Sequence, residues 1–131
     1  MNKTLFVVAV LLTALSSCKK DLATQWIGTY NGTAGTNTFN QIVISKVDDT
    51  TIKMEFKTMV LGTPYTYATV AHGTVTSNNA VAVSEDGTIN GQTGTWHFSG
   101  GGSLSGNTLT VNGSATQTGQ STLYYTFVGS K

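Results

Sequence analysis

Apolar and polar residues alternate along much of this chain with a period of two, the pattern of a strand that has one buried face. The clearest case is residues 52–57, where Ile52, Met54 and Phe56 alternate with two lysines and a glutamate. The last strand repeats the pattern, with Leu123 and alternate aromatic residues on one face. These segments predict β-strands with one face packed on a core.

The same reasoning predicts eight strands along the chain. They cover residues 26–33, 39–47, 52–57, 65–75, 81–83, 93–103, 109–111 and 123–127. Most connections are short turns rich in Gly, Asn and Asp, and a less regular connection at 59–64 carries the only proline. No window of twelve residues has the 3.6-residue period of a helix.

These strands are expected to pair antiparallel, because parallel pairing needs crossover segments of a dozen or more residues. An eight-stranded meander has two open edges unless it closes on itself. We therefore predict an all-β domain, an eight-stranded antiparallel up-and-down barrel. A β-sandwich is the alternative, for which only connections 57–65 and 84–94 are long enough.

The N-terminal segment has the order of a secretory signal. A positive charge at Lys3 precedes a mostly apolar run at 5–15, which is too short to span a bilayer, and two serines lead to Cys18. We predict a cleaved signal peptide at 1–17, a tether at 18–24 and the barrel domain at 25–131.

The sequence Leu15-Ser16-Ser17-Cys18 resembles the lipobox of bacterial lipoproteins. The resemblance implies cleavage before Cys18 and a diacylglycerol group on its thiol, so the membrane is the first expected partner. Two or more acyl chains hold a protein on a bilayer stably. Lys19 implies the outer membrane, on its periplasmic face or at the cell surface.

The charge content excludes one class of partner. The chain has seven lysines, six acidic residues and no arginine, for a formal net charge of +1. Such a chain has neither the basic stripe that nucleic acids require nor a guanidinium fork for phosphate. We expect no nucleic-acid binding.

The residues that carry catalysis or bind metals are scattered. His72 and His97 lie in different predicted strands, whereas zinc needs three or four ligands. Four of the acids occupy the turns at 48–49 and 85–86, where they favour local hydrogen bonds. We therefore expect no metal, no cofactor and no enzymatic activity.

Large rings share a face with glycines in two predicted strands, 26–32 and 96–102. An eight-stranded barrel either fills with side chains or holds one small ligand. Inward glycines would leave a hollow mouth, or they would let the strands bend while neighbouring rings cover them. The residues predicted to line or plug this mouth are Tyr30, Phe56, Trp96, Phe98 and Tyr125.

The motif Trp26-Ile27-Gly28-Thr29-Tyr30, followed by a meander, resembles lipocalin-like and avidin-like barrels, above all small lipoproteins with a lipocalin-like domain. The resemblance implies that Trp26 plugs the barrel floor. The chain departs from the lipocalin pattern in two ways: Trp precedes Gly, and no arginine is present to cover the Trp.

Two functions follow as expectations. The first is a lipid-anchored envelope protein that binds a small apolar or amphipathic molecule in the barrel. The alternative is a solid barrel that acts as a non-catalytic module for interaction with, or inhibition of, a protein or glycan, through loops 59–64, 84–94 or 99–103. The protein partner is unknown. The apolar loop at 59–62 either marks such a partner site or folds over a barrel end.

Overall fold

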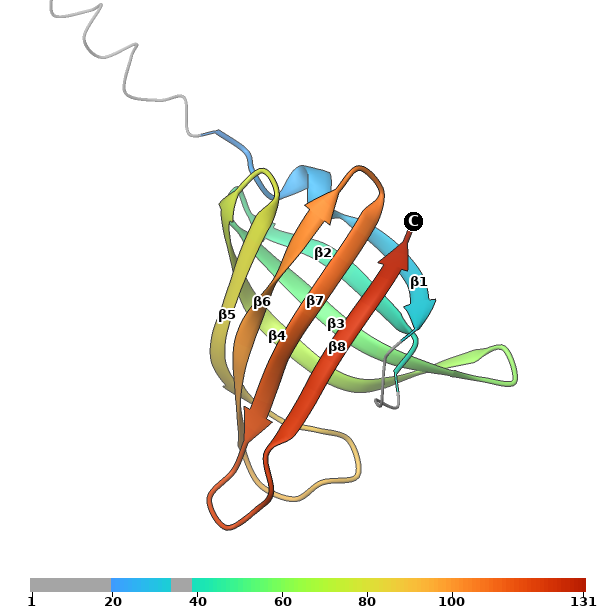
Figure 1. Ribbon diagram of the computed structural model, residues 1–131, viewed down its shortest axis with the longest axis vertical. Coiled ribbons are helices and arrows are strands. Elements are labelled where there is room, and N and C mark those ends of the chain that lie inside the picture. Colours follow the sequence, from blue (N-terminus) through green and yellow to red (C-terminus); the bar gives the residue numbers. More distant parts are fainter. Residues whose placement is uncertain (1–19, 34–38) are drawn as a thin grey trace, which may run out of the picture.

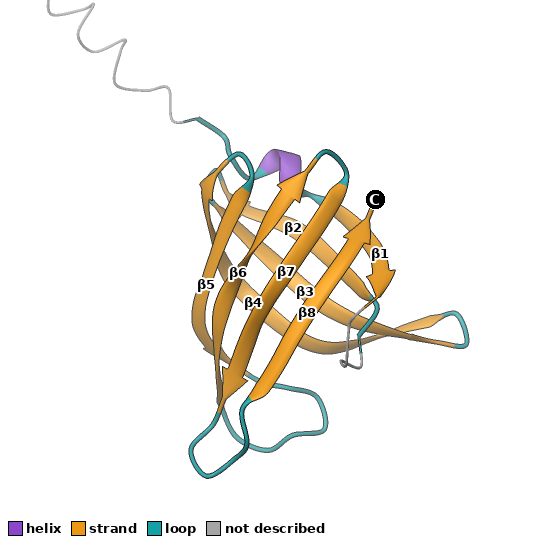
Figure 2. Ribbon diagram, viewed as in Figure 1, coloured by secondary structure: helices purple, strands orange, loops and turns teal. Residues whose placement is uncertain are grey.

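The computed structural model describes residues 20–33 and 39–131, so the predicted signal peptide and Cys18 lie outside the described residues. The chain forms one short 3₁₀ helix, η1 (Thr24–Trp26), and eight strands (Figures 1 and 2). The strands are β1 (Gly28–Thr33), β2 (Gln41–Asp48), β3 (Thr51–Val60), β4 (Thr63–Ser77), β5 (Ala80–Gly87), β6 (Trp96–Ser105), β7 (Thr108–Thr116) and β8 (Leu123–Ser130).

The strands form a closed antiparallel barrel in which each strand pairs with its neighbours in sequence. Closure occurs between the first and last strands, where Asn31 pairs with Ser130 and Gly32 with Gly129. The predicted up-and-down barrel is confirmed, and the sandwich alternative is wrong. Short hairpin connections made the meander the natural topology, and closure removes both sheet edges.

The predicted alternation in β3 and β8 also holds in the structure. Ile52, Met54 and Phe56 are buried, and Tyr125 and Phe127 are buried on β8. Together with the other inward-facing apolar side chains they form one continuous core cluster. The barrel interior is therefore a packed core along most of its length.

Close approach of inward rings to the backbone accounts for two of the glycines. A Cβ on Gly113 would lie 2.4 Å from the Tyr125 hydroxyl oxygen, and one on Gly129 would lie 2.4 Å from the Phe127 ring. Any larger residue at these two positions would displace an inward ring. These two glycines therefore leave room for inward rings. At Gly32 and Gly100, which lie in the two predicted ring-and-glycine segments, a Cβ would instead meet backbone atoms of a neighbouring strand.

The helix η1 lies across one end of the barrel (Figure 2). Trp26, which was predicted to be the first residue of a strand, belongs to this helix and is fully buried. The Tyr30 hydroxyl donates to the Trp26 carbonyl at 2.9 Å. The Lys131 ammonium donates to the carbonyls of Gln25 and Ile27, at 2.9 and 3.0 Å.

Residues just before η1 are also fixed to the barrel. The amides of Leu22 and Ala23 donate to the Asp49 carbonyl at 2.8 and 3.1 Å. The Asp21 carboxylate pairs with the Lys46 ammonium at 2.6 Å. The hydrogen bond from Lys46, followed by the one from the Thr24 hydroxyl, holds the pKa of Asp21 well below its usual value, so the carboxylate stays ionised.

The connection at 59–64 differs from the sequence-based expectation. It is the tip of a long β3–β4 hairpin, in which Met59 pairs with Pro64 and Val60 with Thr63. Leu61 and Gly62 make the turn, both with positive φ (50° and 82°). This hairpin projects from the side of the barrel and does not fold over its end (Figure 1). Residues 99–103, proposed as a loop, lie within β6.

Candidate functional site

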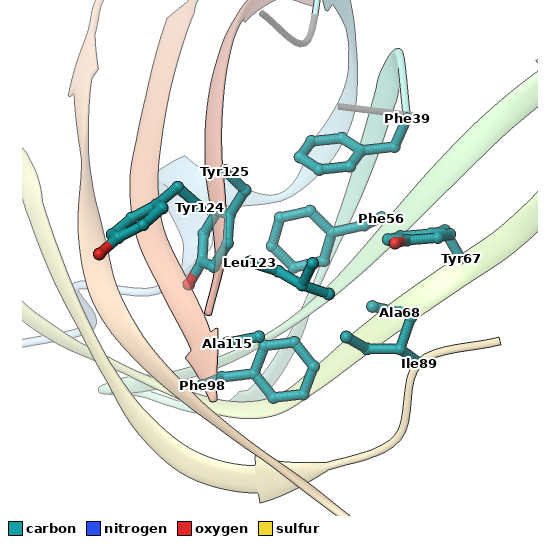
Figure 3. A pocket seen from close by; sticks show the side chains of 10 residues that line it. All are labelled: Phe39, Phe56, Tyr67, Ala68, Ile89, Phe98, Ala115, Leu123, Tyr124 and Tyr125. Atoms are coloured by element: carbon teal, nitrogen blue, oxygen red, sulfur yellow. The ribbon is translucent and has the colours of Figure 1, made fainter. Parts of the chain in front are cut away.

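The end of the barrel opposite η1 has an apolar cavity of about 40 Å³. Strands β3, β4, β6, β7 and β8 and two adjoining loop segments supply the side chains around it (Figure 3). The lining residues are Phe39, Phe56, Tyr67, Ala68, Ile89, Phe98, Ala115, Leu123, Tyr124 and Tyr125. We call this feature the aromatic cavity.

The volume of the aromatic cavity sets what it can accept. A single water needs roughly 10–15 Å³ of such space, and pockets for complete small-molecule ligands span about 300–1,000 Å³. The cavity therefore fits a short apolar group and cannot enclose a whole ligand of ordinary size.

Phe39 and Phe56 hold the centre of the ring cluster. Their centroids lie 5.0 Å apart with planes at 76°, an edge-to-face contact. Phe56 makes a second edge contact with Tyr125 at 5.8 Å, and Phe39 stacks near Tyr67 at 6.4 Å. Such pairs contribute roughly 0.5–1.5 kcal/mol each beyond the burial of their area. The rings thus form a mutually supported wall.

Tyr125 places the polar end of its ring in this apolar setting. Its hydroxyl donates to the Ser99 carbonyl at 3.4 Å. Burial raises the pKa of Tyr125 to about 12, so the hydroxyl is a neutral group at physiological pH. The site presents no charge at this position.

The structure divides the predicted mouth residues between the two ends and the wall. Phe56, Phe98 and Tyr125 line the aromatic cavity together. Tyr30 is at the other end, beneath η1, where its hydroxyl binds the Trp26 carbonyl. Trp96 is buried but does not line the cavity, and its indole nitrogen has no hydrogen-bond partner among the described residues.

Tyr30 was grouped with the cavity residues because it shares an inward face with them. A period of two gives the face of the sheet and does not give the height along the barrel axis. In the β1–β2 ladder Gly28 pairs with Ile44 and Tyr30 pairs with Ile42. Tyr30 is therefore only two residues from the start of β1, which is the end of the strand next to η1. The alternating pattern therefore predicted the inward orientation of Tyr30 correctly, but it could not predict the end of the barrel at which Tyr30 lies.

Several cavity residues were not predicted as site residues. Phe39 precedes β2, and Ile89 lies in the loop after β5, outside any alternating strand. Tyr67 lies on β4 at a register shift, between Ala68, which pairs with Phe56, and Thr66, which pairs with Lys57. Of these unpredicted cavity residues, Leu123 is the one that the sequence could have indicated, because it starts the alternating apolar face of the last strand.

The histidines form two separate surface pairs. His97 Nδ1 lies 2.8 Å from an Asp86 carboxylate oxygen, and His72 Nδ1 lies 3.1 Å from one of Glu85. His97 faces solvent. In residues 20–33 and 39–131, no three of His, Cys, Asp and Glu lie together in a way that could hold a metal ion.

Fold and site together define a class: a small closed up-and-down β-barrel that is plugged at one end and lined with aromatic rings at the other. No protein-family model matches the sequence, and no curated protein sequence matches it. Within the described part of the chain, no helix has the length and apolar content needed to cross a membrane.

One solved structure with this fold comes from Bacteroides fragilis NCTC 9343. It is the crystal structure of a "putative outer membrane protein", which matches 85% of this chain with a TM-score of 0.59 and 17% sequence identity. The match covers 53% of the Bacteroides chain, so this protein spans about half the length of that neighbour. Likeness at this identity supports the barrel fold alone.

Proposed function

We propose that this chain is a lipid-anchored protein of the bacterial cell envelope that binds the apolar part of a small amphipathic molecule in the aromatic cavity. The observation that carries the binding proposal is the position of the cavity: the core is packed elsewhere, and the space left is apolar and lined by rings. Aromatic and aliphatic linings with few polar groups are typical of such sites.

The anchor rests on different support. The sequence before Cys18 has the order of a lipoprotein signal, and the name of the Bacteroides neighbour agrees with an envelope location. Lipid on Cys18 would attach the protein to the outer membrane, and the lipocalin-like resemblance would make Trp26 the plug of the membrane-proximal end. We propose that the chain is not an enzyme, because among the described residues that line the cavity no nucleophile is paired with a base.

Leu123 offers a direct test of binding, because it is partly buried and lies among the cavity side chains (Figure 3). Leu123→Trp should fill the space and weaken binding of 1-octanol at least tenfold. Leu123→Ala should enlarge the space and strengthen binding. Titration followed by NMR of the Ala115 methyl group measures both effects.

The control is Val128→Trp, which places the same ring on β8 at an exposed position. Its octanol affinity should equal that of the wild-type chain. Absence of octanol binding by the wild type, or equal affinity in wild type and Leu123→Trp, would contradict the proposal.

A second candidate function rests on the β3–β4 hairpin tip. Leu61 at the turn is fully exposed (102%), and Val60 and Tyr65 are also exposed, at 48% and 55%. Large apolar side chains at a projecting tip are typical of contacts with a protein partner. This observation favours the interaction module predicted as the alternative.

The test of the hairpin is crosslinking in intact cells followed by recovery of the anchored protein. We expect Val60→Ser combined with Leu61→Ser to reduce the yield of crosslinked partner at least fivefold. Val47→Ser is the matched control, because Val47 is as exposed as Val60 but lies on β2. Equal yields from the double variant and the control would count against a partner at the tip.

A further inference from the structure

The wall between β4 and β5 is joined by a short backbone ladder. Its ladder has three residue pairs and ends at Thr74 and Ala82, whereas β5 and β6 pair from Ala80 to Gly87. Beyond the ladder, Glu85 reaches across with its carboxylate, which accepts the amide hydrogens of Ala71 and His72. One isolated bridge, Ala68 to Ile89, follows nearer the aromatic end.

An open groove of about 360 Å³ lies between β4 and the loop after β5. The groove and the aromatic cavity share three lining residues, Tyr67, Ala68 and Ile89. The two spaces therefore adjoin each other along this short stretch of the barrel rim. A molecule at the rim of the open end can contact both of them.

The two spaces differ in chemistry. The cavity is lined by rings and aliphatic groups, whereas hydroxyl and amide side chains of Thr66, Thr69, Thr88, Asn90 and Gln92 line the groove. Such groups donate and accept hydrogen bonds without carrying charge. Among the described residues, no charged side chain lines the groove.

The loop that forms the outer side of the groove is fixed in place. The Asn90 amide donates to the Tyr67 carbonyl at 2.8 Å, and the Asn90 side chain donates to the Thr66 carbonyl at 3.4 Å. The nearest charged residues along the strands are Lys57, which pairs with Thr66 from β3, and Glu85 and Asp86, which precede Thr88. None of these charged side chains lines the groove.

We propose that the groove and the aromatic cavity form one bipartite site for an amphipathic molecule with an uncharged, hydroxyl-rich head and a single apolar tail. The head lies in the groove against Thr69, Thr88 and Asn90, and the end of the tail enters the cavity past Tyr67 and Ile89. This inference rests on the proposed binding of an apolar group in the cavity and adds the chemical class of the head.

Four probes with the same eight-carbon tail test the head specificity: octyl β-glucoside, 1-octanol, octyl sulfate and octyltrimethylammonium, each as monomer. We expect the glucoside to bind at least tenfold more tightly than the two charged probes and more tightly than octanol. NMR titration should shift amide signals of Thr69, Thr88 and Asn90 with the glucoside and leave them unshifted with octanol.

Thr69→Val combined with Thr88→Val removes two hydroxyls and nearly keeps side-chain shape. This variant should lose the preference for the glucoside and keep the wild-type affinity for octanol. Thr116→Val combined with Thr118→Val is the control, because both residues lie on a different surface, beside His97.

Equal binding of all four probes, tightest binding of octyl sulfate, or an unchanged preference in the Thr69/Thr88 variant would each overturn the bipartite site. Octanol binding separates this result from the proposed function. If octanol binds while the head has no effect, the cavity proposal stands and the groove proposal falls. If octanol does not bind, both fall.

Discussion

Trp26→Ala is expected to lower the free energy of unfolding by about 3–5 kcal/mol, the range for truncating a large buried ring. Trp26 is fully buried at the η1 end, and Tyr30, equally buried, binds its carbonyl. Removing the indole leaves a void that the closed barrel cannot easily fill, because its strands are tied all around. Urea unfolding of a chain that begins at residue 20 measures the loss.

Two conservative variants separate packing from hydrogen bonding at this end. The Trp26 indole nitrogen has no hydrogen-bond partner among the described residues, so Trp26→Phe loses volume alone and should cost much less than the alanine variant. Tyr30→Phe removes one hydrogen bond and should cost roughly 0.5–1.5 kcal/mol. A loss below about 1 kcal/mol for Trp26→Ala would show that the ring does not support the barrel.

Cys18→Ala is expected to abolish acyl labelling of the protein and to leave the precursor uncleaved by the lipoprotein signal peptidase. The thiol is the acceptor of the diacylglycerol group in the lipobox pathway that the sequence resembles, and the chain has no second cysteine. Growth with a labelled fatty acid, followed by gel electrophoresis, measures both labelling and precursor size.

The matched control for the anchor is Ser17→Ala, which keeps a small residue before the cysteine and should be labelled and processed normally. The control also shows that the change in the signal does not itself block export. Normal labelling of Cys18→Ala would disprove the lipobox interpretation. Loss of labelling in both variants would point instead to failed export.

The fold was predictable because its information is local. Alternation at residues 52–57 and short turns such as 106–107 indicate antiparallel hairpins, and the absence of crossover segments leaves few topologies. The first strand was less well predicted. Trp26 fits the alternation with Tyr30, yet it turns into a 3₁₀ helix, because burial under the barrel end outweighs its strand propensity.

The site was predictable only in part, and the reason is geometric. Phe56, Phe98 and Tyr125 follow from inward alternation. Their assembly with Phe39 and Ile89 depends on a loop and on a single bridge to β4, which no local pattern specifies. The sequence also left open whether residues 59–62 form a projecting partner site or a loop over the barrel end. The outcome depends on the hairpin turn at Leu61 and Gly62, which lets β3 and β4 continue beyond the barrel.

The clamped segment before η1 has a consequence for orientation. Asp21 is held by Lys46 at the plugged end, and Cys18 is three residues earlier, a span of at most about 11 Å for an extended chain. A lipid on that cysteine would hold the plugged end next to the bilayer. The ring-lined end of the barrel would then face away from the bilayer and toward the surrounding aqueous compartment.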